Sequence, residues 1–106
     1  MIMNTIEKLT CVTTDKESYN GQPLYKALLN IAKKSNVLHA SATKGIELVS
    51  SASNSVNSNA FQNAILPVFV QVVGTTEDND LFLKKVAPII EGHVIMKEQI
   101  QMAVVN

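Results

Sequence analysis

Apolar residues recur along the chain with two different spacings, and the first spacing predicts a strand. Residues 4–14 are rich in β-branched side chains and roughly alternate in polarity, so we expect a strand there. Ile6, Leu9 and Cys11 are its candidate core positions. A polar turn follows at residues 15–21, after which the apolar spacing becomes helical.

The helical spacing predicts a first helix over residues 22–36. Leu24, Leu28 and Ile31 recur at i, i+4 and i+7, which places them on one face of a helix. Pro23 suits the first helical turn, because the N–H that it lacks would have no partner there.

The second half of the chain predicts two strands, a helix and a final strand. Residues 37–49 have a weak strand pattern with small side chains in the middle, whereas residues 64–74 give the strongest strand signal in the chain. Residues 75–92 predict a helix that begins with a threonine cap and acidic residues. Residues 98–106 alternate in polarity and predict the last strand.

The predicted order is βαββαβ, the α+β ferredoxin-like arrangement with an antiparallel four-stranded sheet. We expect one domain over residues 1–106, which is an ordinary length for a single core. Residues 64–74 are apolar on both faces, so the strand should be buried on both sides. Helices can cover one face, and the other face needs a partner sheet, which predicts an oligomer.

A long polar segment, residues 46–63, separates the second and third predicted strands. From Ser50 to Asn63 it contains five Ser and four Asn, and Val56 and Phe61 are its only sizeable apolar side chains. Such a segment cannot bury enough apolar surface to offset the entropy of ordering. We expect it to be mobile without a ligand or partner, and to use Val56 and Phe61 as contacts when it docks.

The charge of the chain limits its partners. Nine lysines balance nine acidic residues, and arginine is absent, so the formal net charge is zero. Nucleic acid is therefore not expected as the main partner, because phosphate backbones require a positive surplus. An RNA-recognition module would also need stacking aromatic residues, and Phe69 is the only one on the central strands. Acyl-phosphate hydrolases share the element order but use an arginine.

The cellular context is predicted from the cysteine content and from the lack of targeting signals. Cys11 is the only cysteine, so no intrachain disulfide can form, and one thiol suits a reducing compartment. The first residues show neither the basic nor the apolar region of a signal peptide. The longest apolar run is interrupted at Gln71 and is too short to span a bilayer. We expect a cytoplasmic protein without direct membrane insertion.

The candidate chemistry of the chain is sparse. No catalytic constellation is present, so we do not expect an enzyme. His39 and His93 are the only imidazoles, and neither has metal-ligand spacing to other donors. Thr43, Lys44 and Gly45 provide a hydroxyl, a cation and a glycine that lets backbone N–H groups approach an anion. These three residues are a candidate phosphate cradle.

Several stretches resemble PII-like signalling proteins, and especially the branch catalogued as a domain of unknown function. The main one is YNGQPLYKALLNIAKKSNVLHASATKGI, at residues 19–46. Residues 43–47 are similar to the V-K-G-F-G sequence at the base of the PII T-loop, and residues 65–67 to the F-L-P that opens the third strand. Residues 92–95 are similar to the G-K-I-F at the exit of the B-loop. The resemblance covers residues 5–105.

This resemblance implies a homotrimer with an adenine nucleotide (ADP, ATP or AMP) in the clefts between subunits, acting as an effector rather than a cofactor. It implies that residues 46–63 act as a T-loop that docks onto a transporter, a channel or an enzyme. The ligand-binding residues that it implies, together with the cradle above, are His39, Ser41, Thr43, Lys44, Gly45, Gly92, His93 and Lys97.

The chain departs from the PII pattern at three points. Glu47 stands where PII proteins have glycine, and the phosphate-binding arginines near their C-terminus have no counterpart except Lys97. The B-loop is also shorter. We therefore expect fewer charged contacts to the ligand and a preference for ADP or AMP over ATP. The segment contains no tyrosine, which excludes the tyrosine uridylylation that some PII proteins undergo.

Three alternatives remain open from the sequence. A metal-responsive trimer of the divalent-cation-tolerance type would have to use His39, His93 and Cys11 as ligands. An assembly protein could bind its partner through the trimer and loop without nucleotide control. A small oxygenase or hydrolase is the third.

Overall fold

A computed structural model of the chain describes residues 2–49 and 65–105. Its main elements are β1 (Ile2–Thr14), α1 (Leu24–Lys33), β4 (His39–Lys44), β5 (Pro67–Gly74), α2 (Thr76–Val86) and β6 (Ile95–Val104). Three shorter elements are β2 (Ser18–Tyr19), β3 (Gln22–Pro23) and the 3-10 helix η2 (Ala87–Ile89).

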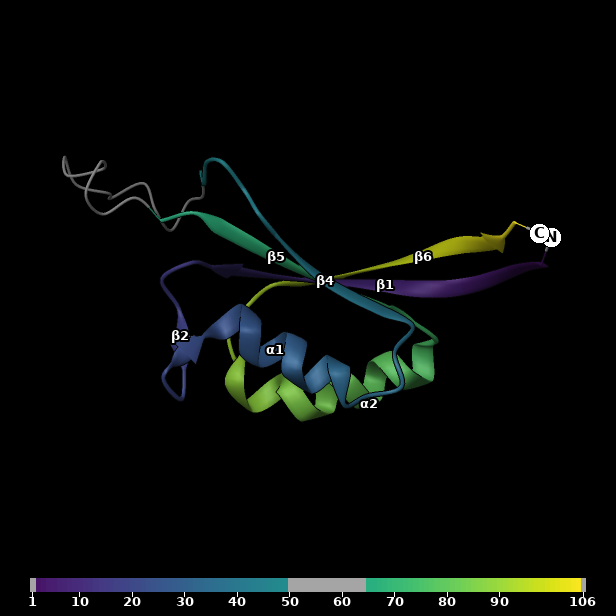
Figure 1. Ribbon diagram of the computed structural model, residues 1–106, viewed down its shortest axis with the longest axis horizontal. Coiled ribbons are helices and arrows are strands. Elements are labelled where there is room, and N and C mark those ends of the chain that lie inside the picture. Colours follow the sequence, from purple (N-terminus) through teal and green to yellow (C-terminus); the bar gives the residue numbers. More distant parts are fainter. Residues whose placement is uncertain (1, 50–64, 106) are drawn as a thin grey trace.

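The main strands form one antiparallel sheet in the order β4-β5-β1-β6. β1 lies in the interior of the sheet, where Cys11 is opposite Val70 of β5 on one side and Ile95 of β6 on the other. Both helices cover the same face of the sheet (Figure 1). The predicted α+β ferredoxin-like fold is therefore confirmed.

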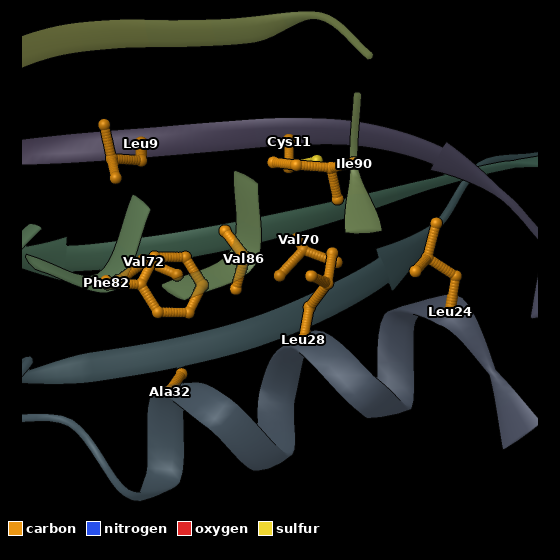
Figure 2. Close-up of a cluster of buried hydrophobic side chains, with 10 residues drawn as sticks. All are labelled: Leu9, Cys11, Leu24, Leu28, Ala32, Val70, Val72, Phe82, Val86 and Ile90. Carbon is orange, nitrogen blue, oxygen red and sulfur yellow. The ribbon is translucent and has the colours of Figure 1, made fainter. Parts of the chain in front are cut away.

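The hydrophobic core lies between this face and the two helices (Figure 2). Its buried members are Leu9, Cys11, Val70 and Val72 from the sheet, Leu24, Leu28 and Ala32 from α1, and Phe82, Val86 and Ile90 from α2 and the turn after it. Ile6 is also buried, but strand alternation puts it on the opposite face from Leu9 and Cys11. The three candidate core positions of β1 thus belong to two faces.

The helix boundaries follow local chemistry. Thr75 caps α2, and its Oγ1 accepts a hydrogen bond from the N–H of Asp78 at 3.1 Å. The predicted helix of residues 75–92 is shorter in the structure, because α2 ends at Val86 and continues as η2. Pro88 lies in η2 and has no N–H to continue the α-helical bonding. Gly92 then reverses the chain with φ of +83°.

The second face of the sheet, here called the open face, is not covered by any helix of the described residues (Figure 1). It carries Lys8, Thr10 and Val12 of β1, Phe69, Gln71 and Val73 of β5, Met96, Glu98 and Ile100 of β6, and His39, Ser41 and Thr43 of β4. β5 thus has Val68, Val70 and Val72 toward the helices and two further apolar residues on the open face.

Candidate functional site

Several chain segments meet at one end of the sheet, where β1, one of the two interior strands, finishes. Lys44 closes β4 and lies opposite Val68 of β5, which in turn lies opposite Thr13 of β1. β6 begins beside the same part of β1, since Ile95 is opposite Cys11. We call this region the loop end of the sheet; it consists of residues 14–17, 44–45, 66–67 and 92–94.

Asp15 connects three of these segments. Its N–H donates to the carbonyl of Leu66 at 2.9 Å, and the N–H of Leu66 donates to its Oδ1 at 3.0 Å. The ammonium of Lys44 lies 3.5 Å from Oδ2. The hydrogen bond from Leu66 lowers the pKa of Asp15, partial burial opposes this shift, and the charges of Lys44 and Lys16 add to the lowering. Asp15 is therefore a fixed, charged group that touches both chain segments flanking residues 46–65.

Gly45 has a structural reason to be glycine. Its N–H donates to the carbonyl of Pro67 at 2.7 Å, and a Cβ on Gly45 would lie 2.6 Å from Cγ of Pro67. Positive φ is recorded only for Asn20, Gly21 and Gly92 among the described residues, so the close approach to Pro67 is the constraint. The phosphate cradle predicted from sequence assigned backbone N–H groups near Gly45 to an anion. In the structure the Gly45 N–H is instead bonded to the neighbouring strand.

His93 is held at the same end of the sheet by Glu17. Oε2 of Glu17 contacts Nε2 of His93, and the hydroxyl of Thr14 donates to Oε1 of Glu17 at 3.0 Å. Nδ1 of His93 lies 3.4 Å from the carbonyl of Glu91, so a protonated ring can donate from both nitrogens. Burial alone would lower the pKa of His93, but the hydrogen bond and charge of Glu17 outweigh it and raise the pKa.

Lys44 and His93 therefore approach the same short turn. Their carboxylate partners, Asp15 and Glu17, are two residues apart, which places the two Cα atoms within about 7 Å. Each of these two basic residues is paired with an acid of the same chain. Lys44 is the more accessible cation, with 58% of its side chain exposed.

The structure places His39, Ser41 and Thr43 on the open face of β4, apart from Lys44. Side chains alternate along a strand, and Thr43 lies opposite Phe69 whereas Lys44 lies opposite Val68. The hydroxyl and the ammonium of the predicted cradle therefore leave opposite faces of the sheet. His39 lies five residues from Lys44 at the other end of β4, a distance of roughly 17 Å.

The remaining sequence candidates lie away from the loop end or outside the described residues. Lys97 is opposite Leu9 in the sheet, and its ammonium lies 3.6 Å from Oδ1 of Asp80 in α2. Glu47 is exposed. Val56 and Phe61, the predicted partner contacts, lie outside the described residues. Within one chain, Lys44 with Gly45 and Gly92 with His93 lie at the loop end on opposite edges of the sheet, and the turn of residues 15–17 links the two pairs.

A separate open pocket of about 360 Å³ lies between the C-terminal end of α1 and the start of β4. Its lining includes Lys33, Leu38 and His39. His39 is the only candidate residue in it, so this pocket and the loop end are two different places in the chain.

Sequence reasoning missed Asp15 and Glu17, which it placed in an unspecified turn. In the structure β2 and β3 pair as a hairpin over residues 18–23. Its two-residue loop is Asn20 and Gly21, with φ of 51° and 79°. An Asn-Gly pair is the usual signal for such a hairpin. This hairpin could have been predicted from the sequence. It would have indicated that Asp15 and Glu17, which precede it, have fixed positions.

Two further observations limit the chemistry of the described residues. They contain no cluster of three or more His, Cys, Asp or Glu side chains that could hold a metal ion. Neither α1 nor α2 is long and apolar enough to cross a membrane.

Comparison with solved structures defines the class of the fold. CPII from Thiomonas intermedia K12, bound to ADP, AMP and acetate, is 11% identical with a TM-score of 0.68, and the match covers 98% of this chain and 94% of that one. The apo form of CPII, described as a nitrogen regulatory PII-like protein, is 11% identical with a TM-score of 0.63, over 95% of each chain. At such identities the likeness concerns the fold alone, and this fold is that of PII-like proteins.

The chain itself belongs to the DUF190 family, described as Uncharacterized ACR, whose profile matches residues 6–102. No curated protein matches the chain. The fold also resembles LarC2, the C-terminal domain of a cyclometallase involved in synthesis of the NPN cofactor of lactate racemase. That likeness has 12% identity and a TM-score of 0.65, and it covers 97% of this chain but 59% of the other. The fold therefore occurs in proteins of different activity, and the function has to be argued from the site.

Proposed function

We propose that this protein is a cytoplasmic signalling protein rather than an enzyme. In this proposal it binds an adenine nucleotide between the subunits of a homotrimer and regulates a transporter or channel through residues 46–63. The observation that carries the proposal is the position of Lys44 and His93. They lie at the same end of the sheet, near its two opposite edges, and each is paired with an acid of the turn that follows β1.

The nucleotide phosphates are assigned to Lys44 and His93. Lys44 can donate charge-assisted hydrogen bonds through its exposed ammonium, whereas His93, whose ring nitrogens face Glu17 and the carbonyl of Glu91, contributes positive charge through its raised pKa. Two cations without an arginine fork favour a ligand of modest charge, so ADP or AMP should bind better than ATP. The solved complexes of CPII with ADP and AMP are consistent with this ligand class for the fold.

The trimer is assigned to the open face of the sheet. Val12, Phe69 and Val73 are half-buried there in the isolated chain, and Met96 is 49% exposed. Packing three such faces around an axis would remove this apolar area from water. The same association would bring a neighbouring subunit to the edge of β4, where His39, Ser41 and Thr43 could complete a cleft with the loop end.

Regulation is assigned to the polar segment because of where it is attached. Lys44 before the segment and Leu66 after it both contact Asp15, so a ligand that changes the surroundings of Lys44 acts at the base of the segment. The described residues that begin it, Ile46 and Val49, are 96% and 83% exposed and are free to contact a partner.

Isothermal titration calorimetry with AMP, ADP and ATP, on protein whose mass is checked by light scattering, tests the proposal. Lys44→Gln should weaken ADP binding at least about tenfold, because a hydrogen bond to a charged group contributes about 1.5–3 kcal/mol. Lys34→Gln is the matched control: Lys34 is an exposed lysine after α1 and should leave the affinity unchanged. A trimer with no nucleotide binding at millimolar concentrations would contradict the proposal.

A further inference from the structure

The two acids that hold Lys44 and His93 are fixed in position by bonds of their own. Asp15 exchanges two hydrogen bonds with the backbone of Leu66, at 2.9 and 3.0 Å, and only 17% of its side chain is exposed. Glu17 accepts from the hydroxyl of Thr14 at 3.0 Å, and its own carbonyl accepts from the N–H of Leu24 at 2.9 Å, where α1 begins. Neither acid can swing away without breaking bonds to the fold.

Of the two basic residues, Lys44 differs from the acids in this respect, whereas His93 is held by Glu17 with 21% of its side chain exposed. The side chain of Lys44 is 58% exposed, and its ammonium lies 3.5 Å from Asp15, at the long end of an ion pair. A lysine ammonium has three donors on a flexible stem, so it can turn toward a second anion. A phosphate that binds Lys44 therefore lies close to the carboxylate of Asp15, whose position is fixed by its hydrogen bonds to Leu66.

From this asymmetry we propose that Asp15 and Glu17 are specificity-determining residues, acting as built-in counter-anions that limit how much negative charge the site accepts. The inference rests on the proposed nucleotide site and specifies its ligand class. Like charges a few ångströms apart repel, and this repulsion grows with each phosphoryl group that the ligand carries. The two carboxylates thus lower the affinity for ATP more than for ADP, and for ADP more than for AMP.

Two isosteric substitutions remove the charge while keeping the local bonds. In Asp15→Asn the amide oxygen can still accept the N–H of Leu66, and in Glu17→Gln the amide oxygen can still accept the hydroxyl of Thr14. Matched controls lie at the start of α2, at the opposite end of β5 from the loop end: Asp78→Asn and Glu77→Gln change the net charge by the same amount. A general effect of net charge would appear in the controls as well.

The experiment is calorimetric titration of the four variants and the unchanged protein with AMP, ADP and ATP, without divalent cations. We expect Asp15→Asn to raise the affinity for ADP about tenfold, with a smaller gain for AMP and a larger gain for ATP. Glu17→Gln should show the same order with smaller gains, because it also removes the charge that raises the pKa of His93. The controls should stay within about twofold of the unchanged protein.

The possible outcomes separate this inference from the proposed function. If the unchanged protein binds nucleotide and Lys44→Gln weakens it, but Asp15→Asn gives equal or lower affinity for all three ligands, this inference is wrong and the proposed site stands. If the controls gain as much as Asp15→Asn, the effect is one of net charge and the inference is also wrong. If no variant binds any nucleotide, the proposed function and this inference fail together.

Discussion

Replacing Gly45 by alanine tests how tightly the two strands are joined at the loop end. The new Cβ would lie 2.6 Å from Cγ and 3.3 Å from Cδ of Pro67, whereas carbon atoms pack at about 3.5–4.0 Å. The overlap of about 1 Å falls on a rigid ring, so β4 and β5 must move apart, and the 2.7 Å bond from Gly45 to the Pro67 carbonyl weakens. Overpacking of this kind costs about 1–3 kcal/mol.

The assay is thermal or urea unfolding of Gly45→Ala beside Pro67→Ala and the double variant. A loss of about 1 kcal/mol corresponds to roughly 4–8 °C in a domain of this size. In Pro67→Ala the ring atoms that clash are absent, and the next neighbour of the new Cβ is Cε2 of Phe69 at an ordinary 3.5 Å. The double variant should therefore be more stable than the sum of the single losses predicts.

Two results would refute this reasoning. One is a Gly45→Ala protein as stable as the unchanged protein, which would show that the strands separate without cost. The other is strict additivity in the double variant, which would show that the loss does not come from contact with Pro67. In either case the glycine at the base of the polar segment would need another explanation.

Three further predictions concern the His93 pair, the core and the open face. Because the folded-state pKa of His93 is raised, its contact with Glu17 stabilises the protein fully below about pH 6.5 and is lost as the pH rises through the folded pKa. The free energy of unfolding, measured from pH 5.5 to 8.5, should therefore fall as the pH rises, and this fall should be absent in Glu17→Gln. An equal slope of free energy against pH in the two proteins would contradict the prediction. Val86→Ala, at a fully buried position, should cost about 2 kcal/mol in urea unfolding, and a loss within error would argue against the described core. Val12→Glu on the open face should convert the proposed trimer to a monomer in light scattering, and an unchanged mass would exclude that face as the interface.

Much of the fold could be predicted because its signals are local. The spacing of Leu24 and Leu28 identified the buried face of α1, and a threonine cap was expected at residue 75 or 76, of which Thr75 caps α2. Ile31, from the same stripe, is half-buried and packs against the core, and the smaller Ala27 and Ala32 beside these residues are buried.

The candidate site was predictable only in part, because its contacts join residues far apart in sequence. Lys44 and His93 could be selected from their motifs, but the bonds from Asp15 to Leu66 and from Glu17 to His93 span 51 and 76 residues. No local pattern carries such a pairing. The same applies to Gly45, whose role depends on the ring of Pro67 in the neighbouring strand.

A crystal structure of the protein grown with ADP tests the central claim most directly. We expect a trimer with ADP between subunits at the loop end, its phosphates within hydrogen-bond distance of the Lys44 ammonium and on the side of the sheet end that His93 occupies. ADP bound instead in the pocket between α1 and β4, beside Lys33 and His39, would contradict the assigned site. ADP bound at one subunit alone, with no contribution from a neighbour, would contradict the proposed assembly.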